Sequence, residues 1–214
     1  MIDGHFKSDI NLFWNFLAKG LVKLGLTPNQ ITWGGLGLIV FQCAIYPLHE
    51  NNLILGFGLL ITFALDALDG AVARITDSST KYGGYLDAVV DRYQEWVVYF
   101  TLAWVWDWWA VCFLAITGSL LISYNKARTA VEMPINNDKW PDLLERMERV
   151  IILCVALMLD PFLSLPDIMG GSLLFATILV LGILTHVTGI QRFYRAREMI
   201  ISYETAQKSA NKTE

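Results

Sequence analysis

Long apolar stretches alternate with short polar connections along most of the chain. Six of these stretches are long enough to span a membrane as helices, because a bilayer requires about 20 apolar residues. They lie roughly at 31–49, 53–74, 84–106, 108–131, 147–165 and 171–194. A transmembrane β-barrel would instead show shorter segments in which apolar and polar residues alternate. The pattern predicts an all-α integral membrane protein with six transmembrane helices.

A different pattern precedes the first of these stretches. Between residues 9 and 24 the apolar side chains fall on one helical face and the polar side chains on the other. The apolar face consists of Ile10, Phe13, Trp14, Leu17, Leu21 and Leu24. This is typical of an amphipathic helix in the membrane interface, although a helix packed on the transmembrane bundle would show it too. We therefore expect a juxtamembrane amphipathic segment, a six-helix membrane domain and a polar cytoplasmic tail, at 1–26, 27–201 and 202–214.

Composition and charge agree with a membrane protein. Of the 214 residues, 55% are hydrophobic, which is too apolar for an ordinary soluble domain of this length. All 16 Lys and Arg residues lie in or beside connections on one side of the predicted spans, and the opposite connections, HENN, VWDWW and DPFLSLPD, carry none. Because positively charged connections stay in the cytoplasm, we expect both termini to be cytoplasmic in a multi-pass protein of the cell membrane. We expect no nucleic-acid partner.

Four aspartates interrupt the second and third apolar stretches near their cytoplasmic ends. Asp66 and Asp69 are three residues apart and Asp87 and Asp91 are four apart, so each pair shares a helix face. The chain reverses direction between the stretches, so the pairs can meet roughly 12 Å below the helix ends. Acids inside a membrane are costly and usually mark function, and carboxylates suit Mg²⁺ or Mn²⁺. The acids predict a metal-binding pocket, in which two metals could also bind a diphosphate.

Small residues and one arginine surround these acids. Small side chains let a flat or phosphorylated group approach the backbone. They stand after the second acid and at the start of the third stretch, at Gly70, Ala73, Gly83 and Gly84. Arg74 can reach a phosphate as a fixed cation. The surroundings of the acids therefore favour a phosphorylated ligand.

The entry to the first span, TPNQIT at 27–32, has two interpretations. Asn29 and Thr32 share a helix face and could contact a nucleotide. The alternative is simple capping of the helix by Thr27 or Asn29 around Pro28. The residues themselves leave both open.

The acids, small residues and arginine form one string from Asp66 to Asp91, D-x2-D-G-x2-A-R-x8-G-x3-D-x3-D. This string resembles the signature of the CDP-alcohol phosphotransferases, with every fixed position present. The six-span layout and the amphipathic helix before it extend the resemblance over nearly the whole chain. Enzymes of that family move a phosphatidyl-type group from a CDP-linked lipid to an alcohol and release CMP.

The resemblance implies a role for each signature residue. Two divalent cations, Mg²⁺ or Mn²⁺, would be held by Asp66, Asp69, Asp87 and Asp91. Asp91 would also be the general base that takes the hydroxyl proton of the acceptor. Gly70, Ala73 and Arg74 would face the CDP moiety, and we place with them Asn29, Thr32, Asp69 and Gly83. Glu95, one turn beyond Asp91, is expected as a buried acid without a catalytic role. The resemblance further implies a homodimer through the third and fourth spans.

Cations also gather near the cytoplasmic ends of the last three spans. The pattern S-x-x-K-A-R at 123–128, followed by E-R-x-E-R at 145–149 and Q-R at 191–192, resembles one branch of the family. That branch makes phosphatidylinositol phosphate or archaetidylinositol phosphate, and its acceptor is inositol 1-phosphate. We therefore predict that the acceptor phosphate is bound by Ser123, Lys126, Arg128, Arg149 and Arg192. We expect Arg146, Arg195 and Arg197 to meet lipid headgroups instead.

Other functions remain open beside this one. Glycerol 3-phosphate is the second candidate acceptor, because it also carries a phosphate. A cation channel or transporter built on the acids would need polar positions across the whole membrane, but the outer halves of the spans are nearly all apolar. An inactive scaffold is disfavoured because no signature residue is missing.

Overall fold

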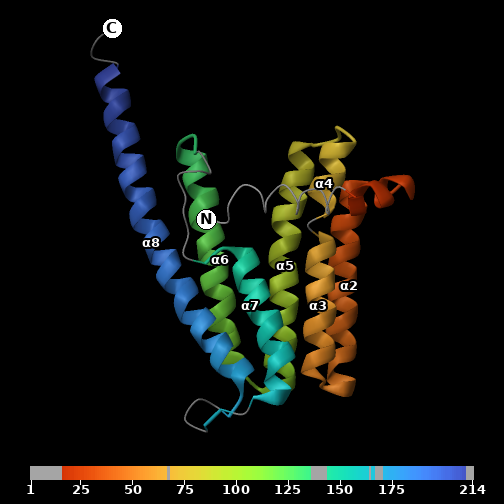
Figure 1. Cartoon of the computed structure of the whole chain (residues 1–214). Coiled ribbons are helices and arrows are strands. Elements are labelled where there is room, and N and C mark those ends of the chain that lie inside the picture. The colour runs from red at the N-terminus through yellow and green to blue at the C-terminus, as the bar shows by residue number, and fades with distance from the viewer. Residues whose placement is uncertain (1–15, 67, 136–143, 164, 167–170, 211–214) are drawn as a thin grey trace. The chain divides into compact units, whose positions relative to one another are not determined.

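The structure is a computed structural model that describes residues 16–66, 68–135, 144–163, 165–166 and 171–210. Its regular elements are helices, which confirms the all-α fold (Figure 1). Residues 16–23 are helical. The helices that follow are, in chain order, α2 (Pro28–His49), α3 (Asn52–Asp66), α4 (Leu68–Ile75), α5 (Lys81–Trp106), α6 (Trp109–Glu132), α7 (Arg146–Leu159), the short 3₁₀ helix η2 (Asp160–Phe162) and α8 (Leu173–Ala210).

Four segments of the described chain are long and apolar enough to cross a membrane: Pro28–His49, Asn52–Ile75, Trp109–Glu132 and Leu173–Ser209. The other two predicted spans correspond to α5 and α7. α5 has 26 residues but carries charged side chains in its first half, and α7 has only 14 residues. The structure thus supports a multi-pass membrane protein, and the count of six spans remains a prediction.

The chain divides into two compact units, Met1–Thr101 and Leu102–Glu214. In the first unit, α2 begins with a capping box. The Thr27 hydroxyl accepts the Gln30 N–H at 3.3 Å, and the Gln30 side chain accepts the Thr27 N–H at 2.9 Å. Pro28 follows in the first turn, where its missing N–H costs nothing. The cap is therefore Thr27, and Asn29 is not needed for that role.

Polar side chains join α2 to α3 within the first unit. The Gln42 amide donates to the Thr62 hydroxyl at 2.7 Å, and the Tyr46 hydroxyl donates to Asn52. In an apolar environment such bonds are retained because no water replaces them. They hold α2 along α3, whose last residue is Asp66.

The predicted second span corresponds to α3 and α4. α3 ends at Asp66 and α4 begins at Leu68, while residue 67 lies outside the described residues. Asp69 stands in the first turn of α4. The helix face that Asp66 and Asp69 are expected to share remains a prediction.

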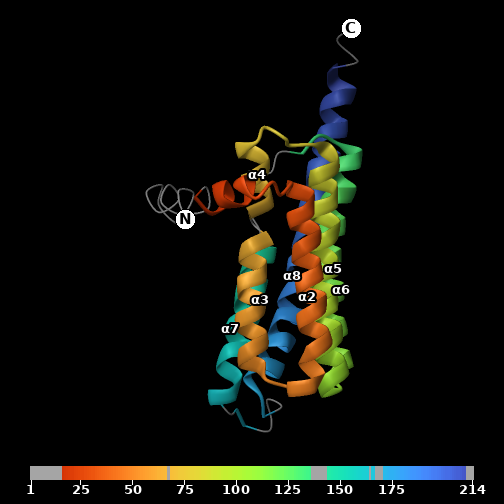
Figure 2. The ribbon, with the colours of Figure 1, turned by 90° about the vertical axis from the view of Figure 1, so that its right-hand side faces the viewer.

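The helical residues 16–23 lie across the start of α2 and pack on α4 (Figure 2). Ala18 is buried together with the α4 residues Leu68, Ala71 and Val72. The partly buried residues that pack against this cluster are Leu17, Leu21 and Val22 of the same helical segment and Ile31 of α2. This packing belongs to the predicted amphipathic helix, whose residues before 16 lie outside the described part. Of the two interpretations, the contacts favour a helix that packs on the bundle, here on α4, which carries Asp69.

The double substitution Leu17→Ser with Leu21→Ser tests this packing. We expect it to lower the free energy of unfolding by about 1–2 kcal/mol, since full burial of one leucine contributes about 1.5–3 kcal/mol and both are partly buried. Thermal unfolding in detergent measures the loss. Phe16→Ser is the matched control, because that side chain is 74% exposed. An unchanged unfolding midpoint for the double variant would contradict the packing.

In the second unit, α6 and α8 pack closely through small residues. A Cβ at Gly182 on α8 would lie 3.2 Å from the backbone nitrogen of Ala115 on α6, so a larger residue there would be tightly packed against the α6 backbone. The Asn125 amide donates to the Gly189 carbonyl at 2.9 Å. Small residues and side-chain amides are the usual means of joining helices in membranes.

α8 is 38 residues long, which corresponds to about 57 Å at 1.5 Å per residue. A bilayer core is only about 30 Å thick. The helix continues as far as Ala210, so the polar tail expected from Ser202 is helical through that residue. The start of this helix is held by Asp160, which accepts the Leu174 N–H at 2.8 Å and the Ser172 hydroxyl at 2.7 Å.

Candidate active site

Three aspartates of the first unit converge. Oxygen atoms of Asp66, Asp87 and Asp91 all lie within 4.8 Å of one another. Asp66 comes from the end of α3 and is 4% exposed, whereas Asp87 and Asp91 come from successive turns of α5 and are half-buried. Carboxylates this close repel one another unless a cation lies between them. The donor set therefore fits a hard divalent cation, which prefers oxygen ligands.

Asp69, the fourth predicted ligand, lies outside this group of three. Its Oδ2 accepts the Thr32 hydroxyl at 2.6 Å, and its Oδ1 accepts the Gly70 N–H at 2.5 Å. Thr32 belongs to α2 and is 2% exposed. The hydrogen bond across the two helices orients Asp69 toward α2, so Thr32, expected against a nucleotide, contacts a carboxylate directly.

A pocket of about 230 Å³ adjoins these acids. Asp69 and Asp87 line it, so it shares Asp87 with the group of three carboxylates. Its wall includes every residue that the sequence suggested for the CDP moiety: Asn29, Thr32, Asp69, Gly70, Ala73, Arg74 and Gly83. The residues predicted around one ligand are thus brought around one space.

The pocket also has walls that the sequence did not suggest. Ser78, Ser79 and Thr80 line it from the turn between α4 and α5. The Thr80 hydroxyl accepts the Gly83 N–H at 2.9 Å, and a Cβ at Gly83 would lie 3.1 Å from that hydroxyl. The only signal for these residues was a run of three hydroxyl side chains between the two pairs of acids.

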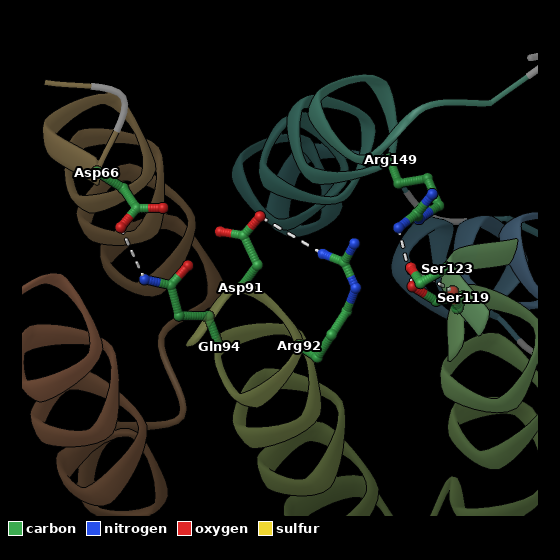
Figure 3. A network of polar contacts seen from close by, with 7 residues as sticks. All are labelled: Asp66, Asp91, Arg92, Gln94, Ser119, Ser123 and Arg149. Carbon is green, nitrogen blue, oxygen red and sulfur yellow. Dashed lines mark hydrogen bonds and ion pairs between the residues drawn. The ribbon is translucent and has the colours of Figure 1, made fainter. Parts of the chain in front are cut away.

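Two neighbours of the acids were missed altogether. Gln94 on α5 is completely buried, and its amide donates to Asp66 Oδ1 at 3.1 Å (Figure 3). Arg92 is one of the 16 cations but had no role in the predicted site, and its guanidinium lies 3.4 Å from the Asp91 carboxylate. A glutamine one turn from Asp91 is a signal only after the fold shows that it is buried and points toward Asp66. Glu95 is 5% exposed, as expected of a buried acid.

In the second unit, two predicted arginines are buried and reach the same part of α6. Arg149 of α7 is 3% exposed and donates to the Ser119 hydroxyl at 2.8 Å and to the Leu144 carbonyl at 3.1 Å (Figure 3). Arg192 of α8 is 6% exposed and donates to the Ile122 carbonyl. Ser123, which donates to the Ser119 carbonyl at 3.2 Å, stands beside them.

The remaining two predicted cations differ from these arginines. Arg128 is exposed and forms an ion pair with Glu132, one turn further along α6. Lys126 is partly exposed. The structure thus gathers Ser123, Arg149 and Arg192 at one level of α6, and it directs Arg128 to a surface ion pair.

Comparison with known proteins places these features in a family. Residues 25–188 match the family described as CDP-alcohol phosphatidyltransferase. The chain is 33% identical over 189 residues to the archaetidylinositol phosphate synthase of Pyrococcus horikoshii, covering 86% of this chain and 90% of that protein. It is 31% identical over 198 residues to the phosphatidylinositol phosphate synthase of Mycolicibacterium smegmatis, covering 85% and 82%.

Solved structures agree with the sequence comparison. The phosphatidylinositol phosphate synthase of Mycobacterium tuberculosis with CDP-DAG bound has a TM-score of 0.72 and 26% identity, covering 86% of this chain and 92% of that one. The same enzyme in complex with manganese and citrate also has a TM-score of 0.72 and covers 86% of this chain and 88% of that one.

Proposed function

The chain belongs to the CDP-alcohol phosphatidyltransferase family, and from this we propose that it is the transferase that joins a CDP-linked lipid to inositol 1-phosphate and releases CMP. The observation that carries the proposal is the position of Asp87, which lies both among the three converging carboxylates and in the wall of the pocket. A metal centre and a nucleotide site would therefore share one residue. The names of the relatives, archaetidylinositol and phosphatidylinositol phosphate synthases, support the acceptor.

The carboxylates fit two divalent cations, Mg²⁺ or Mn²⁺, held by Asp66, Asp69, Asp87 and Asp91. When bound, such cations neutralise the diphosphate and stabilise the leaving CMP. Arg74 adds a fixed positive charge to the same pocket. The CDP moiety is bound between the small residues Gly70, Ala73 and Gly83, together with Asn29 and Thr32, all of which line the pocket.

The transfer itself needs a base and a positioned hydroxyl. Asp91 accepts the proton of the acceptor hydroxyl while the hydroxyl oxygen attacks the lipid-side phosphorus. The new P–O bond to the acceptor forms, the P–O bond to CMP breaks, and CMP leaves with the electron pair. Because Asp91 is half-buried and lies near Asp66 and Asp87, the base is held beside the charged end of the donor.

The acceptor phosphate is bound by Ser123, Lys126, Arg128, Arg149 and Arg192. We assign the larger share to Arg149 and Arg192, since buried arginines form stronger charge-assisted hydrogen bonds than exposed ones. Glycerol 3-phosphate would present the same phosphate. Selection between the two acceptors therefore depends on contacts with the inositol ring.

The placement in the cell follows from the distribution of charge. We propose six spans, with both termini and the active site on the cytoplasmic side of the cell membrane, because all 16 Lys and Arg residues lie on one side of the predicted spans. We also propose a homodimer through α5 and α6. Large aromatic side chains on the exposed face of α5 support it: Tyr93, Trp96, Phe100 and Trp104.

CMP release by the purified protein tests the function. We expect release from a CDP-linked lipid only with Mg²⁺ or Mn²⁺ present, and at least about tenfold faster with inositol 1-phosphate than with glycerol 3-phosphate, a difference of about 1.4 kcal/mol. Assays with ester-linked and ether-linked donors identify the lipid. Faster release with glycerol 3-phosphate would select the second acceptor. Cation flux across vesicles without CMP release would instead indicate a transporter.

A further inference from the structure

One carboxylate of the proposed metal centre is held by a neutral side chain that the proposed mechanism does not use. Gln94 stands three residues after Asp91 on α5 and is completely buried. Its Nε2 donates to Asp66 Oδ1 at 3.1 Å (Figure 3). Both partners are shielded, since Asp66 is 4% exposed. Water therefore cannot replace this hydrogen bond if it is lost.

The backbone of α2 approaches the same pair. A Cβ at Gly35 would lie 3.1 Å from Asp66 Oδ1 and 3.4 Å from Gln94 Nε2. These distances are tighter than most real Cβ contacts, so any larger residue would press on both ends of the hydrogen bond. Gly35 thus leaves room for the bond between Gln94 and Asp66.

The neighbours of Asp66 explain why it needs such support. Oxygen atoms of Asp66, Asp87 and Asp91 all lie within 4.8 Å of one another, so repulsion between these carboxylates disfavours their convergence when no cation is bound. A hydrogen bond from another helix keeps the carboxylate plane of Asp66 in place. A neutral amide sets that plane without cancelling the negative charge, whereas a cation would compete with a metal ion. Carboxylates that ligate metals are commonly hydrogen-bonded in this way.

We propose that Gln94 is a positioning residue that orients Asp66 for binding a divalent cation, and that Gly35 provides the space for it. The proposal rests on the metal-dependent function proposed above.

Mn²⁺ titration of the purified, metal-free protein without lipid tests the proposal directly. We expect Gln94→Leu to raise the Kd for Mn²⁺ about 10–100-fold, the usual effect of losing a partner of a metal ligand. Gln42→Leu is the matched control, because that glutamine also donates within the same unit, to Thr62, but away from the acids. The Kd of Gln42→Leu for Mn²⁺ should stay within about twofold of the Kd of the unsubstituted protein.

Kinetics separate positioning from a general structural defect. For Gln94→Leu the Mn²⁺ concentration that gives half-maximal activity should rise with the Kd, while kcat at saturating Mn²⁺ recovers and KM for inositol 1-phosphate stays unchanged. A structural role would instead lower kcat at every Mn²⁺ concentration, and that result would overturn the proposal.

Gly35→Ala tests the same geometry with Gln94 in place. We expect weaker Mn²⁺ binding, because the new Cβ presses on Asp66, whereas Gly37→Ala on the same helix should bind normally, since nothing lies within 4 Å of its Cβ. Thermal unfolding of the metal-free proteins identifies a variant that has lost its fold, and Gln94→Asn then takes its place. Normal Mn²⁺ binding by folded Gln94 and Gly35 variants would overturn this proposal alone. Absence of saturable Mn²⁺ binding by the unsubstituted protein would overturn the metal centre and the proposed function with it.

Discussion

Asp91→Asn lowers kcat at least about 100-fold, while the affinity for the CDP-linked lipid stays nearly unchanged. The substitution keeps the size of the side chain and removes the negatively charged carboxylate, whose oxygen accepts the hydroxyl proton. Asp66, Asp69 and Asp87 still hold a metal, and the pocket walls are unaltered, because Asp91 does not line the pocket of about 230 Å³. Steady-state kinetics of CMP release and direct binding of the CDP-lipid measure the two effects separately.

Two control variants make this result specific to the base. Glu95→Gln changes a buried acid one turn further along α5 and should leave kcat within about a few-fold, because we assign it no proton transfer. Asp87→Asn should weaken binding of both metal and nucleotide, because Asp87 belongs to the acid cluster and to the pocket wall. Retention of more than about a tenth of the rate by Asp91→Asn would show that another group is the base.

Arg149→Ala or Arg192→Ala raises KM for inositol 1-phosphate at least about tenfold and barely changes KM for the CDP-lipid. Each charge-assisted hydrogen bond to a phosphate contributes about 1.5–3 kcal/mol, and about 1.4 kcal/mol corresponds to tenfold in binding. Both side chains are more than nine-tenths buried, so water screens them little. Kinetics with each substrate varied in turn measure the difference.

The controls for this prediction come from the same helices. Arg197→Ala removes an exposed cation of α8 and should change neither KM, since we expect it to meet headgroups. Arg128→Ala should have a smaller effect than Arg149→Ala, because Arg128 is exposed and already paired with Glu132. Equal effects on the two substrates would contradict the acceptor site. Equal activity with free inositol and with inositol 1-phosphate would contradict the acceptor itself.

Much of this protein follows from local sequence. Helices in a membrane satisfy their backbone hydrogen bonds within one segment, so apolar runs predict where most of them lie without knowledge of their neighbours. Asp87 and Asp91 share a face because their spacing matches a helical turn. A chain reversal between apolar runs suffices to bring Asp66 to the same place. The residues around the pocket were predicted for the same reason, because Gly70, Ala73 and Arg74 follow the acids directly.

Only the tertiary structure decided which polar groups meet across helices. The bonds from Thr32 to Asp69 and from Gln94 to Asp66 join residues 37 and 28 positions apart, and no local spacing specifies such pairs. The sequence also did not show that Gly35 lies against the carboxylate of Asp66. Which acceptor lies within hydrogen-bond distance of a buried donor depends on how α2, α3 and α5 pack. The identity of the acids was therefore determined by the sequence, whereas their orientation was determined by packing.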